Sequence, residues 1–227
     1  MLKIEDKHVY LLFKRGQSKH IKALYEHGVY MSSVDFIRNA DENTERTDKH
    51  DGFAFRKYLG KTKLTIAKTA EDIEKNGLTF DTENTYIVYD EEIKGNIYCL
   101  TGIYSEELSG ERNDIVLDTH AFGEDLIEIK HPKIFLQRVM DGLRELGYKS
   151  IIHEKVTYYD DNYSGELGFF KKHEKFKGQN EFRIFVPNKN NEPIKLNIGS
   201  IRDIASISKN GFLEVHYGDG KIQNITY

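Results

Sequence analysis

The chain carries the stretch KGQNEFRIFV at residues 177–186. Its second half is apolar and rich in aromatic and β-branched residues, and a glycine-containing turn precedes it, so we predict a strand over residues 181–186. Glu181 stands at the mouth of this strand, and Gln179 comes two residues earlier. A strand holds a carboxylate more firmly than a free loop does, which makes Glu181 and Gln179 candidate site residues.

Comparable segments recur along the rest of the chain. They predict strands at residues 9–14, 29–32, 62–68, 85–89, 96–104, 126–130, 151–159, 193–198, 212–217 and 221–226. Segments 85–89 and 96–104 flank the turn signal Lys94-Gly95-Asn96 and are expected to pair as a hairpin. Strands dominate and the few helices do not alternate with them. The predicted fold class is therefore α+β, with a mostly antiparallel β-sheet core and a few flanking helices.

Two predicted helices have clear ends. The first begins with Ser18 as its N-cap and ends at Gly28. The second has Pro132 in its first turn and ends at Gly147. Its predicted buried stripe consists of Ile134, Phe135, Val139, Leu143 and Leu146.

The composition sets limits on the class of protein. Hydrophobic residues make up 38% and charged residues 31%, which indicates a core beneath a polar surface rather than a disordered chain. No segment resembles a linker, so we expect a single domain over residues 1–227. The net charge of −4 gives no general attraction to nucleic acid or to a membrane. The apolar run near the N-terminus is too short for a signal peptide or a membrane span, so we expect a cytoplasmic protein.

Several motifs of common enzyme classes are absent. The only cysteine, Cys99, excludes an intrachain disulfide and a cysteine-based structural zinc site. The sequence contains no glycine-rich dinucleotide fingerprint, phosphate loop or nucleophile elbow. His153-Glu154 and His173-Glu174 lack the second histidine of a zinc-protease motif. These absences argue against a classical dehydrogenase, NTPase, serine hydrolase or zinc protease.

Three segments, taken in order, carry a resemblance to a known group. Residues 20–33 (HIKALYEHGVYMSS) combine a helix, a glycine, an aromatic-containing strand and a serine pair, residues 46–48 (RTD) lie in a polar loop, and residues 179–183 (QNEFR) form a Gln-x-Glu-x-Arg motif. The chain resembles bacterial and phage ADP-ribosyltransferase-like proteins, including toxins that modify DNA or RNA. It also resembles a family of uncharacterised bacterial and phage proteins with the same late motif. It departs from the usual pattern at the first strand, whose centre lacks the customary His or Arg.

The resemblance implies an enzyme that uses NAD as its substrate. Glu181 would be the catalytic acid residue and Gln179 would position the acceptor, while Tyr30 and Ser32 would contact the nicotinamide ribose and Arg46 would meet a phosphate. Cleavage of the nicotinamide–ribose bond builds positive charge on the ribose carbon, which a nearby carboxylate stabilises. The acceptor would be a nucleic acid or a protein, in keeping with a toxin or phage-conflict role. No metal is part of this hypothesis.

Two alternatives come from other classes. The first is a non-enzymatic, phage- or bacteria-encoded binding protein that captures a host protein or nucleotide through a tyrosine-rich surface. That surface would consist of Tyr86, Tyr89, Tyr98, Tyr104, Tyr158, Tyr159 and Tyr163. The second is a metal-dependent nuclease whose site is built from Asp48, Asp51 and Glu181 together with Lys171.

Overall fold

The computed structural model describes residues 8–39, 48, 50–90, 93–109, 111 and 113–227. Its largest sheet has β5 (Gly95–Tyr104) at the centre. One edge of β5 pairs with β12 (Glu181–Pro187). The other edge is shared, because β1 (Val9–Gly16) pairs with the C-terminal end of β5 and β2 (Gly28–Ser33) pairs with its N-terminal end.

Four more strands extend this sheet outward. β1 continues to β7 (Asp125–Ile129) and then to β14 (Ala205–Ser208), β2 continues to β13 (Ile194–Asn197), and β12 continues to β8 (Ile152–Lys155). Every one of these pairs is antiparallel. The predicted α+β class with a mostly antiparallel sheet is confirmed.

Helices cover one face of the sheet more fully than the other. α1 (Ser18–Glu26) and α4 (Pro132–Glu145) share the main core with the inward-facing side chains of β5 and β12. On the opposite face lie α2 (Val34–Arg38) and a smaller apolar cluster that contains Val34, Ile97, Phe169 and Phe185. None of the helices in the described ranges is both long enough and apolar enough to cross a lipid bilayer.

The helix boundaries agree with the sequence patterns, but two buried positions were predicted wrongly. Phe135, Val139 and Leu143 of α4 are fully buried, whereas Ile134 and Leu146 are 45% and 56% exposed. The buried stripe follows an i, i+4, i+8 row from Phe135, and Ile134 lies about 100° around the helix from it.

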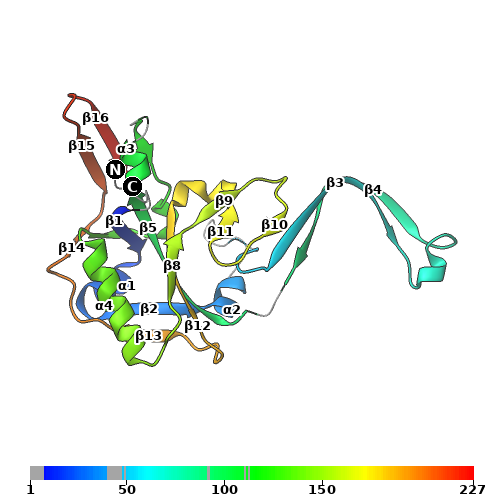
Figure 1. Cartoon of the computed structure of the whole chain (residues 1–227), viewed down its shortest axis with the longest axis horizontal. Helices are drawn as coiled ribbons and strands as arrows, with labels where there is room; N and C mark the ends of the chain where they lie inside the picture. Colours follow the sequence, from blue (N-terminus) through cyan, green and yellow to red (C-terminus); the bar gives the residue numbers. More distant parts are fainter. Residues whose placement is uncertain (1–7, 40–47, 49, 91–92, 110, 112) are drawn as a thin grey trace, which may run out of the picture.

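A long two-stranded arm projects from the body (Figure 1). It consists of β3 (Phe55–Ile66) and β4 (Leu78–Tyr89), with a short 3₁₀ helix, η1 (Ala70–Asp72), near its tip. The predicted hairpin between 85–89 and 96–104 is therefore wrong. The strand at 85–89 is the end of β4 and pairs with β3, while both edges of β5 are occupied by β1, β2 and β12.

Smaller elements complete the fold. β9 (Thr157–Tyr159) and β11 (Lys171–His173) form a parallel pair, and β10 (Gly165–Glu166) adds to the base of β3. A separate three-stranded sheet consists of β15 (Phe212–His216), β16 (Ile222–Thr226) and β6 (Ile115–Val116). α3 (Ser105–Ser109) follows β5, η2 (His120–Phe122) precedes β7, and η3 (Glu174–Gln179) leads into β12.

Candidate functional site

The central sheet opens at the middle of β5. β1 pairs with β5 only as far as Thr101, and the ladder with β2 begins at Ile97. Among the described strand pairs, residues 98–100 have no ladder partner on this edge. The Nζ of Lys14 at the end of β1 reaches into the opening and donates to the carbonyl oxygen of Cys99 at 2.6 Å.

A pocket of about 190 Å³ lies over this opening, and Glu181 is part of its wall. Its lining comes from β1, β5, α2, η2, the segment before β3, and the β11–η3–β12 region. Glu181 faces Thr101 across the β5–β12 ladder, and Arg183 faces Cys99. Because alternate residues of a strand point to the same face, Glu181 and Arg183 lie on the pocket side of the sheet.

The backbone before Glu181 makes an unusual turn. Asn180 adopts a left-handed conformation with φ of 41°, which asparagine tolerates better than most residues. Its Nδ2 donates to the carbonyl oxygen of Gly102 and to Oε1 of Glu107, both at 2.7 Å. The N–H of Glu181 then donates to the hydroxyl of Tyr158 at 2.9 Å. Asn180, the middle residue of the Gln-x-Glu motif, thus stabilises the turn that places Gln179 and Glu181 in the wall of the pocket.

Four charged side chains and one amide form a buried cluster around Glu181. Arg183 binds Asp51 in a bidentate ion pair with N–O distances of 2.5 and 2.8 Å, and its Nη2 also donates to Oε2 of Glu181 at 2.9 Å. The Nζ of Lys172 lies 3.3 Å from the same oxygen and 2.8 Å from Oε1 of Gln179. All five residues are at least nine-tenths buried. We call Asp51, Lys172, Gln179, Glu181 and Arg183 the polar cluster.

The polar cluster favours the ionised forms of Glu181 and Arg183, whereas burial raises the pKa of Asp51 above its usual value. Burial alone would raise the pKa of Glu181, but the attraction of Arg183 and Lys172 outweighs it and holds that pKa well below its usual range. Burial alone would lower the pKa of Arg183, yet Asp51 and Glu181 raise it above its usual value. The Cys99 thiol lies partly buried beside Glu181, and burial raises its pKa to about 12, so it is protonated and unsuited to act as a nucleophile.

The structure brings together two of the predicted site residues. Gln179 and Glu181 meet at Lys172 inside the pocket. Ser32 faces Ile97 on β5, and Tyr30 lies two residues earlier, so both point to the same side of the sheet as Glu181. Neither belongs to the pocket lining, and Tyr30 is 54% exposed. Arg46 lies outside the described residues.

The distance between Ser32 on β2 and Glu181 on β12 follows from the strand register. Ile97 and Thr101, the partners of Ser32 and Glu181, are four residues apart on β5, and β2 and β12 flank β5 on opposite edges. With about 3.3 Å per residue and about 4.8 Å between strands, the Cα atoms of Ser32 and Glu181 are about 16 Å apart. An extended ligand is needed to reach both.

Sequence reasoning placed Asp51 with Glu181 only in the nuclease alternative, and it did not identify Lys172 or Arg183 as partners of Gln179 and Glu181. Arg183 follows Glu181 by two residues, and this i, i+2 spacing on a strand was the available signal. Asp51 lies 132 residues from Arg183 in the chain, and Lys172 stands among other lysines, namely Lys171, Lys175 and Lys177. No local pattern marks either residue as buried.

The alternative site residues are placed differently from the expectation. Asp51 and Glu181 do converge, but the guanidinium of Arg183 lies against both. Asp48 accepts hydrogen bonds from the backbone N–H groups of His50 and His173, and Lys171 donates to Tyr163 and Glu166. Within the described ranges, no group of three His, Cys, Asp or Glu side chains is arranged to hold a metal ion.

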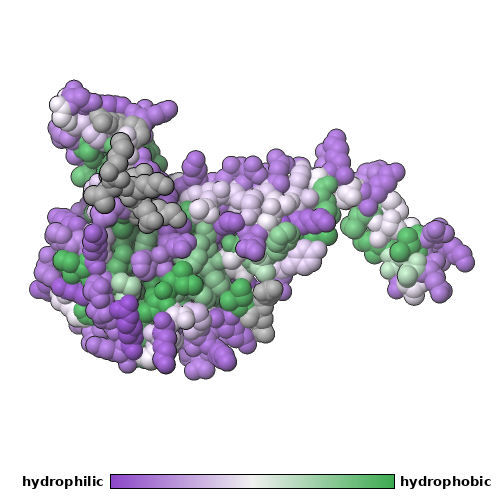
Figure 2. Space-filling view, viewed as in Figure 1, coloured by the Kyte–Doolittle hydropathy of each residue, from purple (hydrophilic) through white to green (hydrophobic). Residues whose placement is uncertain are grey.

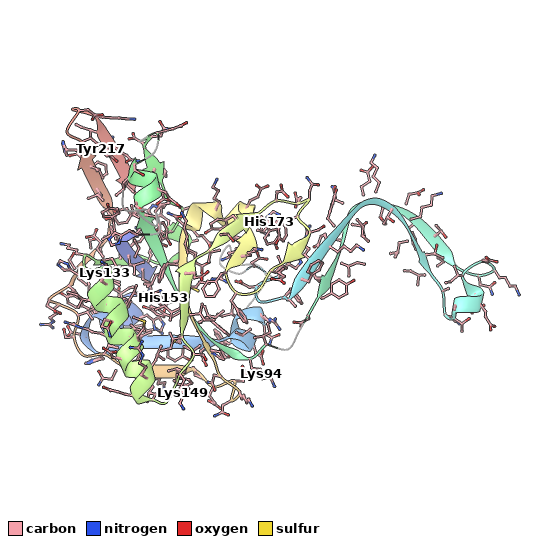
Figure 3. The ribbon with its side chains drawn as sticks, in the orientation of Figure 1. Lys94, Lys133, Lys149, His153, His173 and Tyr217 are labelled. Carbon is pink, nitrogen blue, oxygen red and sulfur yellow. The ribbon has the colours of Figure 1, made fainter. Side chains whose placement is uncertain are left out.

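The tyrosine-rich surface is not present as predicted. Tyr98, Tyr104 and Tyr159 are buried in the interior, and of the seven tyrosines only Tyr89 is exposed. The two His-Glu dipeptides are also separate, since His153 lies on β8 and His173 at the end of β11 (Figure 3).

Comparison with known proteins found no matching family model, no matching curated protein and no matching solved structure.

Proposed function

We propose that the chain is an ADP-ribosyltransferase-like enzyme that uses NAD, with Glu181 as its catalytic acid residue. The observation that supports this most directly is the position of Glu181, which stands with Gln179 in a pocket at the opening between β1 and β2. At about 190 Å³, the pocket is smaller than the roughly 300–1,000 Å³ typical of sites for whole drug-sized ligands. It suits the nicotinamide end of the dinucleotide.

In the proposed reaction, the bond between the nicotinamide nitrogen and the ribose carbon breaks, and its electron pair leaves with nicotinamide. The ribose carbon gains positive charge, and the Glu181 carboxylate stabilises it because its lowered pKa keeps it ionised. An acceptor nucleophile positioned by Gln179 then bonds to that carbon and gives its proton to water. Lys172 and Arg183 hold the Glu181 carboxylate in one orientation before the substrate arrives.

The remaining predicted contacts lie along the same face of the sheet. Ser32 is about 16 Å from Glu181, too far for both to contact one ribose. Ser32 and the exposed Tyr30 are therefore proposed to contact a part of the dinucleotide farther from the bond that breaks, and Arg46 is proposed to meet a phosphate. We propose a nucleic acid or a protein as the acceptor, and a cytoplasmic toxin or phage-conflict role.

The test compares wild type with Glu181→Gln, which keeps the shape of the side chain. NAD at 100 times its dissociation constant should stabilise wild type by about 2.7 kcal/mol, and incubation with acceptor mixtures should release nicotinamide. Glu181→Gln should abolish nicotinamide release while retaining the fold. A Glu214→Gln variant, altered at a half-exposed carboxylate on β15, serves as the matched control. Absence of NAD stabilisation in wild type, or full release by Glu181→Gln, would contradict the proposal.

A further inference from the structure

A second and larger pocket lies on the other face of β12 from the Glu181 carboxylate. Phe182 lines it, and successive side chains of a strand point to opposite faces of the sheet. Its volume is about 710 Å³, within the roughly 300–1,000 Å³ of sites for whole small molecules. We call it the β8 pocket, because His153, Glu154 and Lys155 of β8 form part of its wall.

The floor of the β8 pocket is apolar and partly aromatic. Its least exposed lining side chains, each at most 8% exposed, are Tyr104, Leu136, Val156 and Phe182. Leu136 comes from α4, and Figure 2 shows hydrophobic residues at the surface of the body in the region where Figure 1 draws α4 and β8. A flat apolar molecule therefore finds a matching surface here.

Two tyrosines of the pocket have their hydroxyls occupied by the backbone of β12. The hydroxyl of Tyr104 donates to the carbonyl oxygen of Glu181 at 3.3 Å, and the hydroxyl of Tyr158 accepts from the N–H of the same residue at 2.9 Å. Because these hydroxyls are committed to Glu181, the tyrosines offer a ligand mainly the carbons of their rings. They add to the aromatic character of the pocket.

An imidazole stands beside this floor with its nitrogens available. His153 is partly buried on β8, and its ring centroid lies 5.9 Å from that of Phe182 with 36° between the ring planes. Within the described residues, its ring nitrogens make no hydrogen bond. A nucleobase stacks well on such a ring, and an imidazole nitrogen donates to or accepts from the polar edge of a base.

The charges at the rim disfavour an anionic ligand. The ammonium of Lys155 is compensated by an ion pair with Glu106. Among the other described residues that line the pocket, Lys177 is basic, whereas Glu154 and Glu174 are acidic, and all three are exposed. A phosphate placed here would meet more negative than positive charge. A neutral ring system with hydrogen-bond donors and acceptors avoids this repulsion.

We propose that the β8 pocket binds an uncharged purine nucleoside. The bicyclic base lies over the apolar floor beside His153, and the ribose hydroxyls donate to the carboxylates of Glu154 and Glu174 at the rim. The same rim disfavours nucleotides and nucleic-acid strands, since both carry phosphate. Nucleoside binding here requires nothing of the Glu181 carboxylate, which points to the opposite face of the sheet.

Equilibrium dialysis of the full chain against adenosine, and separately against guanosine, tests the site. A dissociation constant of about 100 µM or below is expected for a ligand of this size. The 5′-monophosphate of the nucleoside that binds should bind at least about tenfold more weakly, because of its phosphate. Absence of binding of both nucleosides up to about 1 mM, or equal or tighter binding of the monophosphate, would overturn the proposal.

A substitution at His153 locates the bound nucleoside. His153→Ala removes the stacking surface and should weaken binding by about 5- to 150-fold. His216→Ala, at an exposed histidine on β15 outside the pocket, is the matched control and should bind like wild type. Glu181→Gln should also bind like wild type, which separates this site from the chemistry proposed at Glu181. Unchanged binding by His153→Ala, or equal losses in the two histidine variants, would place the nucleoside elsewhere and overturn the assignment.

A double substitution at the rim tests the argument from charge. Glu154→Gln/Glu174→Gln keeps hydrogen-bond acceptors but removes two negative charges, so the monophosphate should gain affinity relative to the nucleoside by about tenfold. Glu71→Gln/Glu214→Gln changes the net charge equally at two exposed residues outside the pocket and should leave that ratio as in wild type. An unchanged ratio in the rim variant would show that its acids do not select the ligand.

Discussion

Arg183 and Glu181 are two residues apart on β12, and the Nη2 of Arg183 donates to Oε2 of Glu181 at 2.9 Å. The same guanidinium holds Asp51 in a bidentate pair. One buried cation therefore compensates two buried carboxylates from segments far apart in the chain. The polar cluster connects the candidate catalytic residue directly to the stability of the fold.

Replacing Arg183 with methionine should strongly destabilise the protein. It would leave Asp51 and Glu181 buried with only Lys172 to compensate them, and removing one partner of a buried ion pair typically costs about 3–5 kcal/mol. Urea denaturation measures the change in the free energy of unfolding. Arg138→Met, which breaks the exposed pair with Asp203, is the control and should change stability much less. Equal losses in the two variants would contradict this account.

The stabilising effect of Glu181 should depend on pH. Because Arg183 and Lys172 hold its pKa below the ordinary value of about 4.3, its ionised form contributes stability that is complete above that value and is lost as the pH falls below it. The free energy of unfolding of wild type minus that of Glu181→Gln should therefore shrink between about pH 5 and pH 3. Urea denaturation at a series of pH values checks this. A difference that grows on acidification would show the opposite sign of the pKa shift.

Asn180 should be sensitive to its replacement by alanine. The variant would lose both side-chain hydrogen bonds and put alanine, which tolerates a left-handed conformation less well than asparagine, at a φ of 41°, at a combined cost of about 2–4 kcal/mol. Asn180→Gly loses the same hydrogen bonds but tolerates the backbone conformation, so it should be about 1 kcal/mol less destabilised. Thermal or urea unfolding of both variants measures the difference. Equal stability of the two would argue against a left-handed residue 180.

Two neighbouring residues of α4, Ile134 and Phe135, differ sharply in their exposure to solvent. Phe135 is fully buried in the main core, whereas Ile134 is 45% exposed. Phe135→Ala should cost about 3–5 kcal/mol through loss of packing and the cavity that it leaves. Ile134→Ala should cost well under half as much. If Ile134→Ala proved the more damaging change, the orientation of the helix would be different from the one described.

Sequence patterns predicted the local elements well and the pairing of distant ones poorly. The helix that begins at Pro132 and the strand that begins at Glu181 both have strong local signals, namely a proline in the first helical turn and a glycine-containing turn before an apolar run. The partner of the strand at 85–89 has no such signal. A turn-like sequence lies between it and β5, but β3 takes its edge instead.

The candidate site divides in the same way. Gln179 and Glu181 are close in sequence, and a strand that begins at Glu181 already brings them to one place. Asp51, which binds Arg183, joins the polar cluster only through the tertiary fold, because it lies 132 residues from Arg183 in the chain. The left-handed conformation of Asn180 could not be predicted from the sequence either. Asparagine occurs in many turns, and the φ of Asn180 depends on contacts with Gly102 and Glu107.

The two edges of β5 gain their partner strands at different times during synthesis of the chain. β1 and β2 precede β5 in the chain, so one edge can be paired as soon as β5 emerges. The other edge waits for β12, which begins 77 residues after β5 ends at Tyr104 (181 − 104). At about 5–20 residues per second, translation leaves this apolar edge open for about 4–15 s. During that interval the nascent chain presents an aggregation-prone strand that chaperones are suited to shield.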